Sequence, residues 1–167
     1  LSEEDMSSFS TSVGNFNDDT HFDLLSCLQK SIRGSDPDAT AFYVGKLVAA
    51  GELLALCRRL QVIASEDIGL AYPQAAAITR ACCESAVALG LPEGRIPLIN
   101  AAILLATSPK SNSAYLALDA AMQDINDGKG VVVPAHLQSP LFKGYRYPHD
   151  YPDHYVAQEY LPDDLRG

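Results

Sequence analysis

Apolar residues recur along most of this chain at intervals of three and four positions, which is the spacing of one face of an α-helix. Leu25, Leu28 and Ile32 form the first such face. Between the apolar stretches stand residues typical of helix ends, with Gly after one helix and Asp, Asn or Pro before the next. The pattern predicts helices at about 20–33, 37–50, 52–64, 72–90, 92–106 and 112–127.

The segment from Ile32 to Pro37 shows how sharply these helices are separated. Gly34 suits the left-handed residue just past a helix end. Asp36 is a good N-cap for the next helix, and Pro37 fits its first turn. Asn112 is expected to cap the last helix in the same way.

Aligned apolar residues give these helices one apolar face, which the third and fifth helices are expected to turn inward, and the alanines of the fourth helix allow a close neighbour. The predicted faces are Ala39, Phe42, Tyr43, Leu47 and Ala50 in the second helix, Leu53, Cys57, Leu60 and Ala64 in the third, Ile96, Ile99, Ala102, Ile103 and Ala106 in the fifth, and Tyr115, Leu118, Met122 and Ile125 in the last.

The two ends of the chain differ from its helical middle. Residues 1–19 are polar and indicate a linker, so the predicted domain is 20–167, with helices to about 128. Residues 129–167 are rich in Gly, Pro and Tyr and lose helical periodicity, although Val131, Val132 and Val133 could form a short strand. We expect this irregular tail to wrap over the helices as ordered structure, because exposed aromatic rings are costly. Its packing anchors are expected to include Tyr145, Tyr147, Tyr155 and Tyr160.

The helical pattern predicts an all-α helical bundle, and the composition excludes some functions. The chain has 167 residues, 47% of them hydrophobic, which is enough for one domain with a core. The formal charge of −9 opposes non-specific nucleic-acid binding. The sequence contains no apolar run long enough to cross a membrane, and its polar start predicts no signal peptide. The cysteines lack CxxC spacing, which indicates reduced thiols in a cytosolic protein: Cys27, Cys57, Cys82 and Cys83.

The usual nucleotide-binding and nucleophile motifs are absent: the chain contains no GxxxxGK[ST], GxGxxG or GxSxG. His149 and Asp150, with His154 five residues on, suggest a metal site or an acid–base pair, but a third ligand is missing from the pattern. A bond from a tail histidine to a backbone carbonyl is the favoured interpretation. Asp36 and Asp38 are better explained by helix capping than by acid–base catalysis.

Charged residues offer two further hypotheses. The pair Arg58 and Arg59 ends seven residues before Glu66 and Asp67 begin, which favours an intramolecular ion-pair network over a contact with another subunit or domain. A basic nucleic-acid patch with stacking tyrosines is the weaker hypothesis, because the net charge is acidic. Its members would be Lys30, Arg33, Lys110, Lys143 and Arg146, with Tyr145 and Tyr147.

Seven short sequence motifs occur in a characteristic order along the chain. They are KSIRGSDPDA (30–39), RRL (58–60), ASEDIGLA (64–71), LPEGR (91–95), PKSN (109–112), GYRYPHD (144–150) and QEYLPD (158–163). From His21 onward the chain therefore resembles the C-terminal part of the replication-associated recombination protein A family, also called MgsA. These are bacterial AAA+ ATPases, related to the eukaryotic Werner-helicase-interacting ATPase. The segment 138–143 is shorter than the resemblance predicts.

The resemblance implies a helical collar like that of DNA polymerase clamp loaders, which serves as an oligomerisation domain and forms homotetramers. It implies that the ATPase module, with its ATP and Mg, lies upstream, so no catalysis, cofactor or metal is expected here. The full-length protein is expected to act on forked DNA at stalled replication forks with single-strand-binding protein. A cytoplasmic, nucleoid-associated location follows, with no membrane contact.

Two alternatives remain open from the sequence. One is a stand-alone helical adaptor that binds a partner protein, and the other is a small hydrolase using His149 and Asp150, which the missing nucleophile motif disfavours. The candidate interface or interaction residues are Arg33, Asp36, Arg58, Arg59, Glu66, Asp67, Lys110, Asn112, Tyr145, Arg146, His149 and Asp150.

Overall fold

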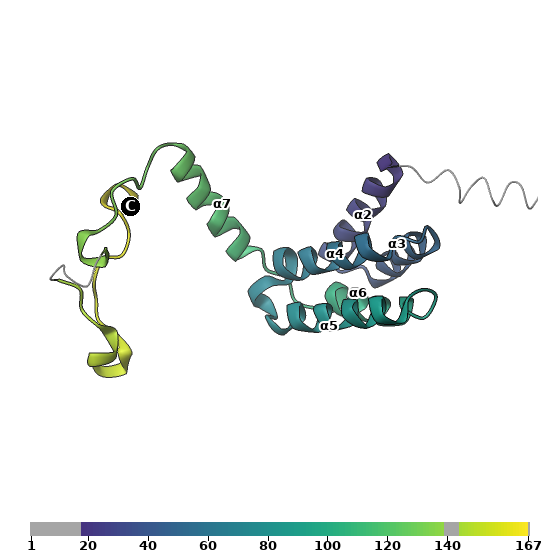
Figure 1. The fold of residues 1–167 in the computed structure, drawn as a ribbon. Helices are drawn as coiled ribbons and strands as arrows, with labels where there is room; N and C mark the ends of the chain where they lie inside the picture. Colours follow the sequence, from purple (N-terminus) through teal and green to yellow (C-terminus); the bar gives the residue numbers. More distant parts are fainter. Residues whose placement is uncertain (1–17, 139–143, 167) are drawn as a thin grey trace, which may run out of the picture. The chain divides into compact units, whose positions relative to one another are not determined.

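A computed structural model describes residues 18–138 and 144–166 (Figure 1). Most of the predicted linker and the short segment 139–143 thus lie outside the described residues. The chain divides into two compact units, one up to Tyr115 and one from Leu116 onward. The α-helices are α2 (Asp18–Arg33), α3 (Pro37–Ala49), α4 (Leu53–Ile63), α5 (Gln74–Leu89), α6 (Arg95–Thr107) and α7 (Ser113–Asn126). The described residues contain no strand, which confirms the all-α class.

The helix boundaries follow the local signals closely. Asp36 caps α3: its Oδ1 accepts a hydrogen bond from the backbone N–H of Ala39 at 2.9 Å. The prediction for the end of α2 was wrong by one residue, because Ser35 rather than Gly34 takes the left-handed conformation, with φ +58°. The N–H of Asp36 then donates to the carbonyl of Ser31 at 3.0 Å and closes the end of the helix.

The hydrophobic core lies within the first unit, where α2 packs on α3, α5 packs on α6, and α3 packs on α6 (Figure 1). The predicted apolar positions of α2 are confirmed by their burial, as are Cys57, Leu60 and Ala64 of the third predicted helix, whereas Leu53 is only partly buried. The largest fully buried side chains are Leu28, Ile32, Leu47, Leu56, Leu60, Ile63, Ile68, Leu98 and Leu105.

Two predicted faces were partly wrong. In α3, Phe42 is 59% exposed, and Val44 occupies the core instead. In α6, Ile96 is 57% exposed, and the buried face carries Leu98 and Leu105 together with three alanines. Nearly every residue of α6 is apolar, so no polar face distinguishes its buried side from its exposed side.

The second unit contains most of α7 and an irregular tail. Single helical turns occur at Ala135–Leu137, Pro148–Asp150, Pro152–His154 and Asp163–Leu165, and the short strand suggested at Val131–Val133 is not formed. A side chain joins two separate parts of the tail. Gln158 donates a hydrogen bond to the backbone carbonyl of Arg146 at 2.7 Å and accepts one from the backbone N–H of Arg146 at 3.1 Å.

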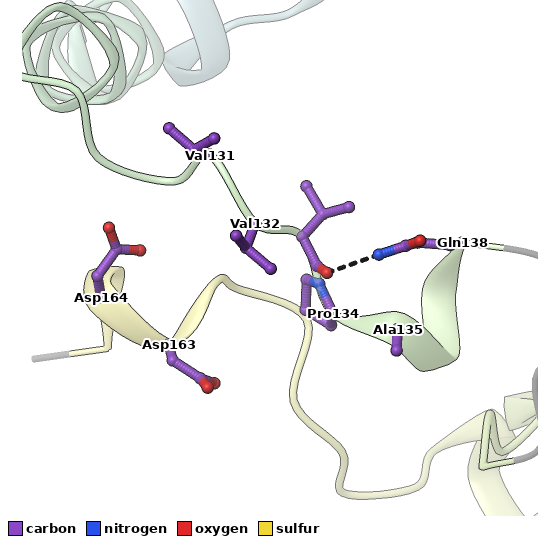
Figure 2. Close-up of a pocket in the computed structure, with 8 residues that line it drawn as sticks. Val131, Val132, Pro134, Ala135, Gln138, Asp163 and Asp164 are labelled. Atoms are coloured by element: carbon purple, nitrogen blue, oxygen red, sulfur yellow. Dashed lines mark hydrogen bonds between the residues drawn. The ribbon is translucent and has the colours of Figure 1, made fainter.

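A hollow of about 430 Å³ lies between the valine segment and the final turn of this unit (Figure 2). Gln138 closes one side by donating to the carbonyl of Val133 at 2.9 Å. The aromatic rings of the tail are less buried than expected, since Tyr155 is 72% exposed. Tyr145, Tyr147 and Tyr160 are about half exposed, so these rings are weak packing anchors.

Candidate functional site: a charged junction before the last helix

The site is built where α4 changes its winding. After Ile63 the helix continues as one π-helical turn, Ala64–Ile68, in which the N–H of Gly69 donates to the carbonyl of Ala64. The sequence predicted that the helix ends at Ala64. The sequence did contain a signal for the longer helix, namely apolar residues that continue at helical spacing past Ala64. One helical face carries Leu60, Ile63, Ala64, Asp67 and Ile68, and this spacing places the Asp67 carboxylate on the buried side.

Asp67 is only 5% exposed, and both of its carboxylate oxygens accept hydrogen bonds. Arg33 Nε lies 2.7 Å from Oδ1, and Gln29 Nε2 lies 3.1 Å from Oδ2. A buried carboxylate is tolerated when it is paired and hydrogen-bonded in this way. The bond to Asp67 in turn raises the pKa of the Arg33 guanidinium.

Gln29 is the residue that sequence reasoning missed. It is 7% exposed, donates to Glu66 Oε2 at 2.9 Å as well as to Asp67, and accepts from Arg59 Nη1 at 2.8 Å. An uncharged side chain carried no obvious signal, although Gln29 stands one helical turn before Arg33 on the same face of α2. We name the side chains of Gln29, Arg33, Arg59, Glu66 and Asp67 the charged junction.

The predicted ion-pair network therefore exists with different partners. Arg33, not Arg58 or Arg59, pairs with the acidic residues, and its Nη2 lies 3.8 Å from Glu66. Arg59 joins through Gln29, whereas Arg58 is exposed. Which arginine reaches Asp67 depends on how α2 packs beside α4, and spacing within α4 does not report that.

A connecting segment, residues 108–112, leads from α6 to α7 across the π-helical turn. The N–H of Ser111 donates to the backbone carbonyl of Asp67 at 2.8 Å. The approach is close: a Cβ added at Gly69, which has φ +48°, would lie 2.8 Å from the carbonyl oxygen of Ser111. A side chain is therefore excluded where the two segments cross.

Lys110 fixes the same segment from its other side. Its Nζ donates to the carbonyls of Ala106 and Ser108 at 3.0 and 2.6 Å and to Ser35 Oγ at 3.0 Å. Burial lowers the pKa of this ammonium group, while the charge of Asp67 acts in the opposite direction. The segment 108–112 is thus bound to α6 and to the turn between α2 and α3.

The other candidates have more local roles. Asn112 is exposed and stands directly before α7, but it is Ser111 Oγ that accepts from the backbone N–H of Ser113, at 3.3 Å. Asp36 acts as the cap of α3. The remaining four lie in the second unit, where Arg146, His149 and Asp150 make local contacts and Tyr145 is 46% exposed.

Charge-assisted hydrogen bonds join α2, α4 and the π-helical turn, and a backbone hydrogen bond joins the connecting segment 108–112 to that turn. Within residues 18–138 and 144–166, no three His, Cys, Asp or Glu side chains converge as metal ligands. Across the same part of the chain, the structure has no helix with the length and apolar character needed to span a membrane. The chemistry of the charged junction is that of positioning: it holds the connecting segment 108–112 on the π-helical turn.

Residues 34–167 match the family model described as the C-terminal region of the MgsA AAA+ ATPase. The chain belongs to the MgsA AAA+ ATPase C-terminal family. This confirms the resemblance inferred from the seven sequence motifs. Of the charged junction, Arg59, Glu66 and Asp67 fall inside the matched range, together with the whole connecting segment 108–112.

Individual relatives agree with the MgsA assignment. The chain is similar to Replication-associated recombination protein A of Bacillus subtilis, with 50% identity over 158 residues that cover 89% of this chain and 38% of that protein. The protein of the same name from Escherichia coli K12 is 37% identical over 158 residues, covering 88% and 35%. ATPase WRNIP1 of Dictyostelium discoideum is 34% identical over 160 residues, covering 89% and 18%. This chain spans well under half the length of these relatives.

Proposed function

We propose that this MgsA-family region is the oligomerisation domain of an AAA+ ATPase that acts in DNA replication and recombination at stalled forks. The observation that carries the proposal is α7, a helix of 14 residues in which no side chain is buried. Short isolated helices are marginally stable in water, so a well-formed helix without a covered face calls for a partner surface.

The apolar side chains of α7 form a continuous stripe suited to such a contact. Tyr115, Leu118, Met122 and Ile125 follow the alternating three- and four-residue spacing of a helix–helix seam and are between 44% and 63% exposed. Fully burying one such side chain stabilises by about 1.5–3 kcal/mol, so covering the exposed half of four contributes about 3–6 kcal/mol per chain. A second copy of α7 offers the same stripe in return.

The charged junction gives this interface a fixed base. Asp67 binds Arg33 and Gln29 through its carboxylate and the connecting segment 108–112 through its backbone carbonyl. The start of α7 is thereby held against the helical core. In an oligomer built on α7, a fixed helix start would hold the rest of each chain in a set position relative to the interface.

The proposed mechanism is geometric. Four copies of this domain would hold four upstream ATPase modules, which carry the ATP and Mg sites, in a set arrangement around forked DNA. Single-strand-binding protein is the further partner we propose for the full-length protein, in the cytoplasm at the nucleoid. The domain itself supplies assembly rather than catalysis, and we expect it to bind no ATP in calorimetry.

Sedimentation of the purified chain tests the proposal. We expect a mass about four times 17.9 kDa at tens of micromolar. Leu118→Glu should dissociate the assembly, because it places a charge in the stripe. Ala120→Glu adds the same charge on the opposite side of α7 and should leave the mass unchanged. A monomeric wild-type chain would refute the proposal. Equal masses of the two variants would show that α7 is not part of the interface.

A further inference from the structure

Two histidines of the tail face each other across a tight double turn. His149 Nδ1 lies 3.1 Å from His154 Nδ1, and the two ring centroids are 5.1 Å apart. The interpretation favoured from the sequence was that the histidine here bonds a backbone carbonyl, as happens elsewhere in the tail at His136, whose Nε2 lies 2.7 Å from the carbonyl oxygen of Glu159. For His149 it was wrong, because its partner is another imidazole.

The backbone holds this pair in place. Each histidine belongs to a single 3₁₀ turn opened by a proline, Pro148–Asp150 and Pro152–His154. The N–H of His154 donates to the carbonyl of Tyr151 at 3.1 Å. Asp153 and His154 both have positive φ, at +59° and +56°, although neither is glycine. Such conformations cost about 1–3 kcal/mol each and persist where surrounding structure imposes them.

The distance between the two nitrogens matches the spacing of ligands on one metal ion. Nitrogens bound at roughly 2.0–2.1 Å are about 2.9 Å apart at a right angle and about 3.4 Å apart at a tetrahedral angle. The observed 3.1 Å falls between these limits. Without metal, one Nδ1 donates its proton to the other; with both protons on Nε2, both Nδ1 lone pairs are available as ligands.

We propose that His149 and His154 chelate one divalent transition-metal ion through their Nδ1 atoms. Imidazole suits Cu²⁺, Ni²⁺ and Zn²⁺, and the Irving–Williams order ranks Cu²⁺ above Zn²⁺. No third His, Cys, Asp or Glu side chain joins the pair among the described residues, so water completes the coordination. We therefore expect a dissociation constant in the micromolar range, weaker than that of a structural metal site. A bound ion links the side chain of His149 to that of His154. This proposal is independent of the oligomerisation role.

Isothermal titration of the 167-residue chain with Zn²⁺, Cu²⁺ and Mg²⁺ tests the chelate. We expect one saturable site for Zn²⁺ with a Kd on the order of 1–100 µM, tighter binding of Cu²⁺, and no binding of Mg²⁺. His149→Ala and His154→Ala should each weaken Zn²⁺ binding by about tenfold or more. His136→Ala is the matched control, because it removes a tail imidazole outside the pair and should bind as wild type does.

The outcomes separate cleanly. Loss of binding in both pair variants, with the control unchanged, supports the chelate. Equal affinity in wild type and His154→Ala overturns it, as does the absence of saturable Zn²⁺ binding. Circular dichroism of each variant checks that its helices are intact, so weakened binding reports the ligands themselves and not unfolding.

Discussion

Substituting Gly69 with alanine tests whether the crossing of the connecting segment 108–112 over the π-helical turn supports the fold. Gly69 has φ +48°, and an added Cβ would lie 2.8 Å from the carbonyl oxygen of Ser111. Its ψ is −129°, which lies outside the left-handed helical region, and this conformation costs an alanine about 1–3 kcal/mol. Relief of the overlap displaces the segment and breaks the bond from Ser111 N–H to Asp67, which adds about 1–3 kcal/mol for a polar group left unpaired. We expect Gly69→Ala to lower the free energy of unfolding by about 2–6 kcal/mol.

Alanine substitutions at two other glycines separate the cost of the backbone conformation from the cost of the overlap with Ser111. Gly51 also has positive φ, at +75°, but no atom lies within 4 Å of an added Cβ, so Gly51→Ala measures the conformational cost alone. Gly45 lies inside α3 with open space around it, and Gly45→Ala should stabilise by about 0.5–1 kcal/mol.

Urea unfolding followed by circular dichroism, at one fixed protein concentration, gives all three values because oligomerisation shifts apparent stability. If Gly69→Ala and Gly51→Ala agree within about 0.5 kcal/mol, the close approach of the segment contributes nothing and our reasoning fails.

Three further predictions concern capping, the charged junction and alkaline pH. Asp36→Ala should destabilise by about 0.5–2 kcal/mol through loss of the α3 cap, and an unchanged melting temperature would contradict this. Asp67→Ala should cost about 2–4 kcal/mol in urea unfolding, because Gln29 loses a buried partner, whereas the exposed Arg58→Ala should stay within about 0.5 kcal/mol of wild type. Burial raises the pKa of Cys83 from 9.0 to about 12. The folded thiol then keeps a proton that the unfolded thiol loses, so stability is full below pH 9 and falls by about 1.4 kcal/mol per pH unit above it. Cys83→Ala should reduce that slope, and an identical slope would disprove the assignment.

Local chemistry placed the helices. Asp36 with Pro37 starts α3, Gly51 follows its end, and the apolar spacing of Leu25, Leu28 and Ile32 marks the buried side of α2; each of these features acts within a few residues. The family membership could also be inferred from the sequence, because short motifs in a fixed order are recognisable without knowing which residues are in contact. Capping and periodicity are properties of neighbouring residues, so the sequence alone determines them.

Tertiary packing decided what the sequence left open. Arg33 and Asp67 are 34 positions apart, and their pairing depends on how α2 lies beside α4. Gln29 enters the charged junction only because that packing brings three segments around it. The buried side of α6 was likewise set by its neighbours, since an almost wholly apolar helix has no polar face to exclude alternatives. Long-range pairs and the orientation of uniform helices are determined by contacts between elements, and those contacts exist only once the chain has folded.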